Sequence, residues 1–364
     1  MAGKGRRVNV LVCTSLTDEL LARIAAVGPR VRVVDAAAQL LEELPSTLRP
    51  GQPPAPLREP GRSLNDLLAQ AEVLLAARRL PADLAARSPR LRWVQSPLAG
   101  VELFRQTDLW SKPEIVITSG AGVNSGPVAE YVIAAVLALA KNVPRMLANK
   151  AQRKWDRFTL GQVRGQTMGI VGLGAIGREV ARLAQALGMQ VVATRRRIGA
   201  EAPDAAGWVL PHDQLHRLLA ASDFVVLTVP ATRETAGMIG RRELEAMRPS
   251  ARLINVSRGD VVDQGALIEA LRSGRLAGAA LDVFEAEPLP ADSPLWGMPN
   301  VLISPHIAGL FDDYDVCVVD LFVGNLLRYL DGRPLVNEVD RQQGYCSVRV
   351  AAGAVGVATV EMDH

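Results

Sequence analysis

The chain has 364 residues, a mass of 39.0 kDa and a formal net charge of +3, and 49% of its residues are hydrophobic. This length allows two domains with buried cores, and this composition excludes an intrinsically disordered chain. No long basic segment indicates a nucleic-acid partner, and the three cysteines, at positions 13, 317 and 346, have no metal-ligand spacing. We therefore expect neither a disulfide scaffold nor a metal site.

The N-terminal segment and the lack of long apolar runs predict a cytoplasmic protein without a membrane partner. Basic residues precede the apolar segment 8–13, as they do in a secretory signal, but this segment is too short, and Asp18 and Glu19 follow it closely. No segment reaches the roughly 18 apolar residues of a membrane span. The most apolar one, 128–140, contains Glu130.

Short apolar segments alternate with helix-like segments in the first third of the chain. The pattern predicts buried strands at residues 8–13, 31–34, 72–76, 92–95 and 115–118. Helix-like segments such as 18–27 and 64–70 lie between them, so we expect a parallel sheet with helices on both faces. The proline-rich stretch Pro45–Pro60 predicts an exposed loop inserted into this unit.

A second α/β pattern follows a long apolar helix, which we expect from Gly126 to about Lys141 with Pro127 in its first turn. Strands are predicted at residues 167–171, 190–194, 224–228, 252–256, 278–282 and 301–304. Six strands with intervening helices predict a doubly wound nucleotide-binding sheet. A last helix, 313–330, is too small to be a domain, so we expect it to pack on the first unit.

The glycine-rich segment 172–177 follows a predicted strand and precedes a predicted helix. In such a turn the first glycine permits the tight bend, the second lets the backbone approach a pyrophosphate, and the third lets the helix pack on the strand. The helix N-terminus also offers N–H groups to phosphates. Packing alone can produce glycine turns, but this context favours dinucleotide binding. The residues expected to contact the dinucleotide are Gly172, Gly174, Ala175, Ile176 and Gly177.

Three consecutive arginines, Arg195, Arg196 and Arg197, follow the next predicted strand. NAD-preferring sites usually place an acidic residue there to bind the ribose 2′-hydroxyl, and this chain has none nearby. Guanidinium groups suit a 2′-phosphate because they offer a planar fork of donors to its oxygens. The alternative is a solvated basic loop. We expect NADP(H) as the favoured cofactor and NAD(H) as the alternative.

Three polar residues, Arg258, Glu287 and His306, follow successive predicted strands of the second unit. Reduction of a 2-keto acid needs a cation for the carboxylate, a proton donor for the carbonyl oxygen and an acidic partner for the imidazole. Arg258, His306 and Glu287 supply these roles in that order. Each alone could be a surface or loop residue. Their occurrence together, downstream of the glycine turn, favours the catalytic interpretation.

These motifs together resemble the D-isomer-specific 2-hydroxyacid dehydrogenase family, which includes glyoxylate/hydroxypyruvate reductases and phosphoglycerate dehydrogenases. The matching stretches are 171–177, 255–259, 281–288 and 304–309, and the resemblance covers residues 5 to 345. It implies that Arg258, Glu287 and His306 are catalytic in hydride transfer between a nicotinamide and a small 2-keto or 2-hydroxy acid. It further implies a cofactor site that includes Val229, Pro230, Val256, Ser257, Asp282, His306 and Gly309, with Asp282 near the nicotinamide amide.

The resemblance also implies a substrate loop at Ser96–Val101, where the backbone N–H groups of Ala99 and Gly100 meet the substrate carboxylate beside Arg258. Glu102 departs from the family, which commonly has aspartate at this position, so the fine geometry of the loop is open. The family forms homodimers built largely through the nucleotide domain. The segment 142–165 is a candidate for the dimer arm.

We therefore expect an α/β fold of two doubly wound parallel-sheet domains with a cleft between them. A flavodoxin-like substrate domain takes residues 1–119 plus 310–345, and a Rossmann NAD(P)-binding domain takes residues 120–309. The remaining residues, 346–364, form a tail to which we assign no function.

A nucleotide-sensing, corepressor-like binding module is the alternative on the same fold, because family members of that kind keep the three catalytic residues. A formate-dehydrogenase-like role is disfavoured because that branch lacks a glutamate at the position of Glu287. A phosphite-oxidising role has no positive support. The sequence identifies neither the particular 2-keto acid nor the physiological direction of the reaction.

Overall fold

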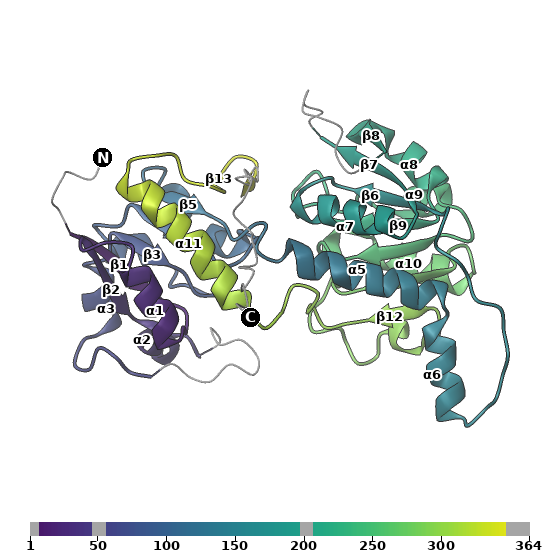
Figure 1. Cartoon of the computed structure of the whole chain (residues 1–364), viewed down its shortest axis with the longest axis horizontal. Helices are drawn as coiled ribbons and strands as arrows, with labels where there is room; N and C mark the ends of the chain where they lie inside the picture. The colour runs from purple at the N-terminus through teal and green to yellow at the C-terminus, as the bar shows by residue number, and fades with distance from the viewer. Residues whose placement is uncertain (1–6, 46–55, 197–206, 347–364) are drawn as a thin grey trace, which may run out of the picture. The chain divides into compact units, whose positions relative to one another are not determined.

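The computed structural model describes residues 7–45, 56–196 and 207–346. Most of the predicted loop Pro45–Pro60, the third arginine Arg197 and the tail after residue 346 lie outside these described residues. The chain divides into two compact units, the first from Met1–Val123 with Asp312–His364 and the second from Asn124–Phe311 (Figure 1). The N-terminal and C-terminal parts of the chain thus belong to one unit.

The first unit contains five parallel strands in the order β2-β1-β3-β4-β5. They are β1 (Val8–Val12), β2 (Val31–Asp35), β3 (Val73–Leu75), β4 (Trp93–Gln95) and β5 (Val116–Thr118). This is the flavodoxin-like order, so the predicted fold class is confirmed for this unit. Because all five strands are parallel, the loops that follow them meet at one edge of the sheet.

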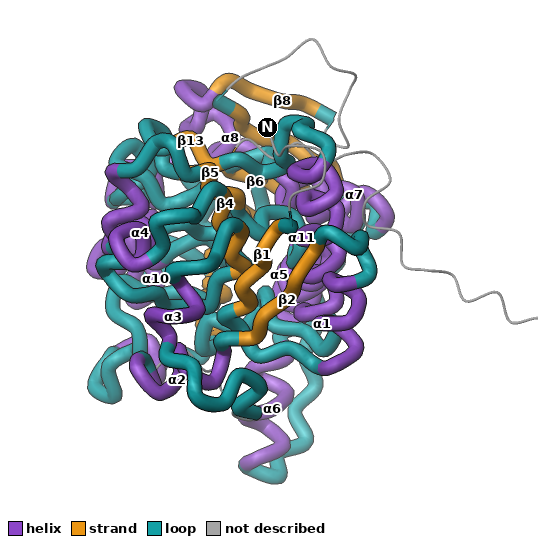
Figure 2. The backbone as a smooth tube through the Cα atoms, turned by 90° about the vertical axis from the view of Figure 1, so that its left-hand side faces the viewer, coloured by secondary structure: helices purple, strands orange, loops and turns teal. Residues whose placement is uncertain are grey.

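Helices cover both faces of this sheet (Figure 2). They are α1 (Asp18–Ala25), α2 (Ala37–Glu43), α3 (Leu64–Leu68), α4 (Leu84–Arg87) and the late helix α11 (Tyr314–Leu330). The start of α1 is set by Thr17, whose side chain accepts a hydrogen bond from the N–H of Leu20. Helix α11 packs on the sheet through aromatic stacking, with the rings of Phe322 and Tyr329 centred 5.1 and 5.7 Å from that of Trp93. A two-stranded hairpin, β13 (Val339–Asp340) and β14 (Tyr345–Cys346), completes the described part.

The second unit contains seven parallel strands in the order β12-β11-β10-β9-β6-β7-β8. They are β6 (Thr167–Val171), β7 (Gln190–Arg195), β8 (Trp208–Pro211), β9 (Phe224–Leu227), β10 (Arg252–Asn255), β11 (Gly278–Leu281) and β12 (Val301–Ile303). The chain moves outward from β6 to β8 and then returns to β9 on the other side of β6. This reversal is the switch point of a doubly wound sheet, which confirms the predicted fold class.

Strand β8 corrects the prediction of six strands in this sheet. It is a short edge strand of partly exposed residues, with Trp208 68% exposed, and it ends in Pro211. Five of the other six strands are largely buried and contain apolar runs that a sequence reveals, and β12, at the opposite edge, is only partly buried but has the apolar sequence Val-Leu-Ile. An exposed edge strand lacks such a run, and proline within a segment argues against a strand.

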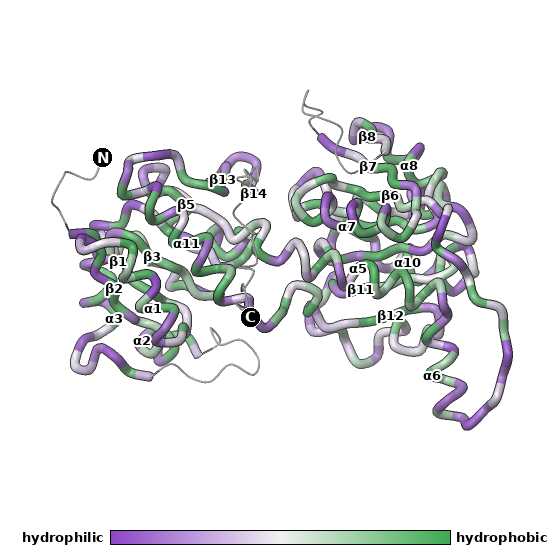
Figure 3. Tube along the Cα trace, viewed as in Figure 1, coloured by the Kyte–Doolittle hydropathy of each residue, from purple (hydrophilic) through white to green (hydrophobic). Residues whose placement is uncertain are grey.

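The described part of the second unit contains six helices. They are α5 (Ser125–Ala140), α6 (Val143–Ala151), α7 (Ala175–Ala186), α8 (Leu215–Ala221), α9 (Arg241–Ala246) and α10 (Gln264–Arg272). Short 3₁₀ turns occur in both units, at Glu102–Gln106 and Asp108–Ser111 in the first and at His212–Gln214, Gly259–Val261 and Pro294–Gly297 in the second. Helix α5 is apolar because Val132, Val136 and Leu139 are buried in the core beneath the sheet. Figure 3 shows the apolar residues gathered along the strands and α5.

Helix α6 was not predicted as a helix, although it lies inside the proposed arm 142–165. Asn142 adopts the left-handed conformation with φ of 54° and separates α6 from α5, and none of the residues of α6 is buried. No single helix in the described part of the chain is long and apolar enough to cross a membrane. Helices α5 and α6 meet the length and composition requirement together, but they are bent by 65° and α5 lies in the core.

Candidate active site

The glycine turn joins β6 to α7, and two of its glycines are required by the fold itself. Gly172 has φ of +103°, and a Cβ atom there would lie 2.8 Å from Cγ1 of Val229. A Cβ atom on Gly177 would lie 2.5 Å from the carbonyl oxygen of Gly172, so this glycine lets the helix pack against the turn. The N–H of Leu173 donates to the carbonyl of Thr194 at 3.0 Å and ties the turn to β7.

Gly174 has a different role, because a Cβ atom there would meet nothing within 4 Å. It is the N-cap of α7, and its position provides no side chain to cap the first N–H groups of the helix. The N–H groups of Ala175 and Ile176 lie in this first turn, where the helix dipole is positive. Bare backbone bordering open space at a helix N-terminus fits the pyrophosphate of a dinucleotide.

Replacing Gly174 with alanine should weaken dinucleotide binding without disturbing the fold. The added methyl group touches no protein atom but enters the space in front of the helix. We expect the Kd for NADPH, measured by fluorescence titration, to rise at least about tenfold, a change of roughly 1.4 kcal/mol. The Tm should change by less than about 2 °C.

Gly177→Ala provides the contrast, because its methyl group would lie 2.5 Å from a backbone oxygen and should lower the Tm. Unchanged NADPH affinity in the Gly174→Ala protein would contradict the assignment of this turn to the cofactor.

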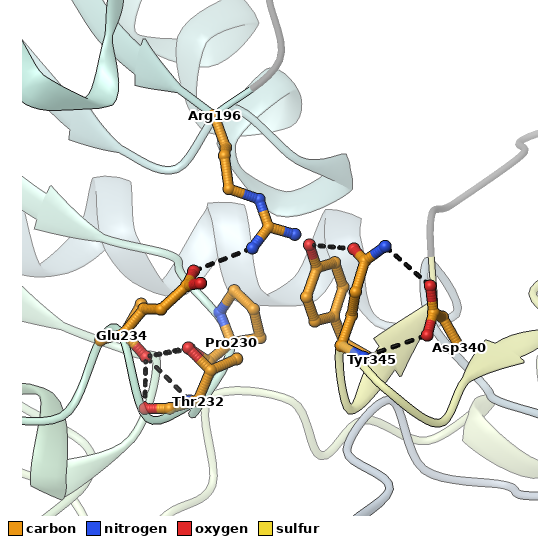
Figure 4. Close-up of polar contacts among 8 residues, drawn as sticks. Arg196, Pro230, Thr232, Glu234, Asp340 and Tyr345 are labelled. Carbon is orange, nitrogen blue, oxygen red and sulfur yellow. Dashed lines mark hydrogen bonds and ion pairs between the residues drawn. The ribbon is translucent and has the colours of Figure 1, made fainter.

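The end of β7 places Arg195 and Arg196 at the same sheet edge as the glycine turn. Nη1 of Arg196 lies 2.9 Å from Oε2 of Glu234, which comes from the loop after β9 (Figure 4). Val229 and Pro230 begin that loop, and Val229 lies beside Gly172. Glu234 could not be predicted from the residues around the end of β7, because it lies 38 residues beyond Arg196 in the sequence.

His306 and Glu287 are in hydrogen-bonding contact at the carboxyl edge of the sheet. Nδ1 of His306 lies 2.8 Å from Oε2 of Glu287, and the other carboxylate oxygen accepts a hydrogen bond from the N–H of Phe284 at 3.1 Å. Both side chains are partly exposed, with 48% of His306 and 37% of Glu287 accessible. The backbone therefore holds the carboxylate, the carboxylate holds Nδ1, and Nε2 is left as the ring nitrogen for proton exchange.

Asp282 holds the loop that carries His306. Its carboxylate is buried and accepts hydrogen bonds from Oγ of Ser304 at 2.5 Å and from the N–H groups of Ile307 and Ala308 at 2.9 and 3.0 Å. The N–H of His306 donates to the Asp282 carbonyl at 2.8 Å, and His306 has φ of 56°. These contacts make Asp282 a positioning residue for His306, and its place near the nicotinamide amide stays a prediction.

Helix α5 reaches the same loop through Tyr131, whose hydroxyl lies 2.6 Å from Oγ of Ser304. Burial raises the pKa of Tyr131, so this hydroxyl stays protonated. Gly309 ends the loop against Asn124, since a Cβ atom there would lie 2.4 Å from the Asn124 side chain. A side chain at Gly309, a predicted cofactor residue, would therefore require the Asn124 amide to move.

The turn that carries Arg258 is shaped by Asn255 at the end of β10. The Asn255 side chain donates to the carbonyl of Arg258 at 3.0 Å and accepts from the N–H of Ser257 at 3.0 Å. Nη1 of Arg258 donates to the carbonyl of Ser257 at 2.8 Å, and the guanidinium is half-buried. A Cβ atom on Gly259 would lie 1.9 Å from the backbone of Phe284, so this turn packs directly on the loop that leads to Glu287.

Strands β10, β11 and β12 are adjacent, so Arg258, Glu287 and His306 all follow neighbouring strands at one sheet edge. Val256 and Ser257 belong to the same turn as Arg258. In the described part of the chain no group of three or more His, Cys, Asp or Glu side chains could hold a metal ion. The three cysteines, at positions 13, 317 and 346, are free thiols.

The predicted substrate loop follows β4 in the first unit and is held from three sides. The N–H of Ser96 donates to Thr118 O at 2.8 Å, the N–H of Gly120 donates to Leu98 O at 2.8 Å, and the Tyr314 hydroxyl donates to Pro97 O at 2.7 Å. Within the described residues, no acceptor in the protein is assigned to the N–H groups of Ala99 and Gly100. Two such donors in a fixed loop suit a carboxylate.

Removing the Tyr314 hydroxyl should loosen this loop. In Tyr314→Phe the buried carbonyl of Pro97 loses its partner, which should destabilise the protein by about 1–3 kcal/mol. We expect the KM for a 2-keto acid to rise severalfold, while NADPH affinity stays unchanged. Steady-state kinetics and fluorescence titration measure the two effects.

Tyr329→Phe is the matched control, because Tyr329 lies on the same helix and donates to Glu72 at 2.9 Å, outside this loop. It should cost stability and leave the KM unchanged. An equal rise of KM in both variants would contradict a specific effect on the loop.

The fold and the site define a nucleotide-binding α/β oxidoreductase, in which a doubly wound sheet carries an arginine and a histidine–glutamate pair at its carboxyl edge. Residues 133–308 match the family model described as D-isomer specific 2-hydroxyacid dehydrogenase, NAD binding domain.

Three similar proteins place this result in context. Glyoxylate/hydroxypyruvate reductase B of Pectobacterium carotovorum is 38% identical over 76% of this chain and 87% of that relative. D-3-phosphoglycerate dehydrogenase of Archaeoglobus fulgidus is 36% identical over 62% of this chain, which spans only 43% of that relative. The crystal structure of a D-isomer specific 2-hydroxyacid dehydrogenase from Xanthobacter autotrophicus, in complex with NADPH and MES, has a TM-score of 0.76 and 29% identity. The structural match covers 93% of this chain and 100% of the Xanthobacter chain.

The chain belongs to the D-isomer-specific 2-hydroxyacid dehydrogenase family. It is an NAD(P)-dependent dehydrogenase of 2-hydroxy acids, so the enzyme interpretation is confirmed and the corepressor-like alternative is not favoured.

Proposed function

We propose that this enzyme uses NADPH to reduce a small 2-keto acid, such as glyoxylate or hydroxypyruvate, to the (D)-2-hydroxy acid. The observation that carries this proposal is the His306–Glu287 pair at 2.8 Å, on strand ends next to the one that carries Arg258. The name of the Pectobacterium relative, glyoxylate/hydroxypyruvate reductase B, supports this substrate class.

Each proposed catalytic residue has its own role in the reduction. When bound, the reduced nicotinamide supplies a hydride for the carbonyl carbon. The guanidinium of Arg258 binds the substrate carboxylate. Nε2 of His306 gives its proton to the carbonyl oxygen, and Glu287 stabilises the imidazolium through Nδ1 at 2.8 Å. Oxidation of the hydroxy acid uses the same groups in reverse.

The preference for NADPH rests on the arginines at the end of β7. Arg195 and Arg196 lie at the end of β7, where dinucleotide-binding folds usually contact the ribose 2′ position, and that strand contains no acid. The Xanthobacter relative was crystallised with NADPH, which supports this cofactor. NADPH in turn favours reduction as the working direction.

A panel of 2-keto acids tested with NADPH and NADH is the decisive experiment, because it reports substrate and cofactor together. We expect oxidation of NADPH with at least one small 2-keto acid and a higher kcat/KM for NADPH than for NADH. Absence of turnover across the panel, together with co-purifying proteins, would contradict this proposal and favour a corepressor-like module.

We also propose a cytoplasmic homodimer formed through the arm 142–165 of the second unit. The arm carries exposed apolar residues, including Leu147 at 59%, Trp155 at 94% and Leu160 at 45%, and such patches mark protein interfaces. The free cysteines support a reducing compartment. Sedimentation should give twice the chain mass, and Leu147→Glu with Trp155→Glu should give monomers. Cell fractionation tests the location.

A further inference from the structure

An acidic side chain that the sequence did not connect with the cofactor lies against one of the arginines expected to select it. Oε2 of Glu234 is 2.9 Å from Nη1 of Arg196, and both side chains belong to the second unit (Figure 4). Glu234 is 73% exposed and Arg196 is 38% exposed, so solvent and a ligand can reach the pair. The Glu234 carboxylate therefore occupies an Arg196 donor to which a phosphate could otherwise bind.

The backbone turn that carries Glu234 is fixed by its own hydrogen bonds. Oγ1 of Thr235 donates to Pro230 O at 2.7 Å and accepts from the N–H of Thr232 at 2.9 Å. The N–H of Thr235 donates back to Thr232 O at 3.2 Å. These bonds close the turn between residues 230 and 235, so the backbone of Glu234 has a defined place. The carboxylate is thus presented to Arg196 by a rigid element.

The location of the pair at the sheet edge connects it with the cofactor. The local strand order is β9-β6-β7, so Arg196 after β7 and Glu234 after β9 flank β6 on its two sides. Strand β6 ends in the glycine turn, where the pyrophosphate is expected. A dinucleotide that extends from this turn toward the end of β7 brings its ribose 2′ position to Arg196, within reach of Glu234.

We propose that Glu234 sets the cofactor preference by competing with the 2′-phosphate for Arg196. The phosphate of NADPH has to displace the Glu234 carboxylate and then remain near it. The two negative charges then repel each other. NADH has a 2′-hydroxyl and takes no guanidinium from Glu234. The carboxylate therefore weakens NADPH binding selectively and reduces the difference in affinity between NADPH and NADH. This inference rests on the proposed NADPH preference.

The test is the substitution Glu234→Gln, with binding measured by calorimetry on the full chain without substrate. NADPH and 2′,5′-ADP should bind roughly two- to tenfold more tightly, the range expected for an exposed ion pair plus residual repulsion. NADH and 5′-AMP should change by less than about twofold, and the gain should shrink at high salt, which screens exposed charges. These probes need no turnover, so the result is independent of the substrate.

Glu269→Gln is the matched control, because Glu269 forms an exposed ion pair with Arg241 elsewhere in the same unit. It should leave all four affinities unchanged. Arg196→Gln separates the inference from the proposed function. If that variant weakens NADPH binding while Glu234→Gln changes nothing, the role of Glu234 is wrong and the NADPH assignment stands. If wild type and Glu234→Gln both bind 2′,5′-ADP no more tightly than 5′-AMP, both proposals fail.

Discussion

Replacing His306 with asparagine should lower kcat for 2-keto acid reduction by about 10²–10⁴-fold, the usual contribution of a positioned general acid. Asparagine fits the same loop but has no ionisable proton to give to the carbonyl oxygen. The loop itself should persist, because Asp282 holds it through the N–H groups of Ile307 and Ala308. NADPH affinity should therefore change little. Steady-state kinetics and NADPH fluorescence titration measure the two quantities.

A second histidine–glutamate pair in the same unit provides the control. Nε2 of His216 lies 3.1 Å from Oε1 of Glu243, and 59% of this histidine is exposed. His216→Asn should leave kcat unchanged, because this pair lies outside the proposed site. Glu287→Gln should give an intermediate loss, since glutamine can accept from Nδ1 but does not stabilise the imidazolium. If His306→Asn kept most of its kcat, His306 could not be the proton donor.

The parts of the fold that could be predicted are those that bury continuous apolar segments. Strand β9 is buried and apolar along its whole length, and β6 is buried and free of polar side chains from Met168 to Val171. The edge strand β8 and helix α6 are largely exposed, and their patterns carry no such signal. The alternation of strands and helices also predicts that the strands are parallel, because parallel strands need crossover connections.

The site divides in the same way between local and long-range features. Arg258, Glu287 and His306 could be connected because each lies in the loop that follows a strand, and strand ends in a parallel sheet share one edge. Side-chain contacts between segments far apart in the sequence could not be predicted in this way. The pair of Arg196 and Glu234 spans 38 residues. The Tyr131–Ser304 contact spans 173 residues and depends on where α5 lies on the sheet.

The positioning role of Asp282 also lay beyond sequence reasoning, for a conformational reason. His306 adopts φ of 56°, which turns the chain so that the N–H groups of Ile307 and Ala308 reach the Asp282 carboxylate. Non-glycine residues seldom take this conformation, and although histidine is among the types enriched there, the residue type alone does not predict it. Backbone strain at this position is maintained by the hydrogen bonds that Asp282 accepts.

Replacing Arg258 with alanine should lower kcat/KM for a 2-keto acid by roughly 30- to 4,000-fold, which corresponds to about 2–5 kcal/mol for loss of one partner of a hydrogen-bonded charge pair. NADPH affinity should be retained, because the glycine turn belongs to a different strand end. Arg258→Lys should recover only part of the loss, since lysine keeps the charge but lacks the planar fork. Arg272→Ala, at the exposed end of α10, is the control and should leave kcat/KM unchanged.

An uncharged substrate isolates the contact itself. A 2-keto amide lacks the carboxylate, so wild type should turn it over poorly, and Arg258→Ala should lose little more with it. The loss caused by the substitution and the loss caused by the amide should therefore not add, which is the signature of two groups in direct contact. Full additivity of the two losses, or unchanged keto-acid kinetics in Arg258→Ala, would show that Arg258 does not bind the substrate carboxylate. Either result would contradict the proposed chemistry.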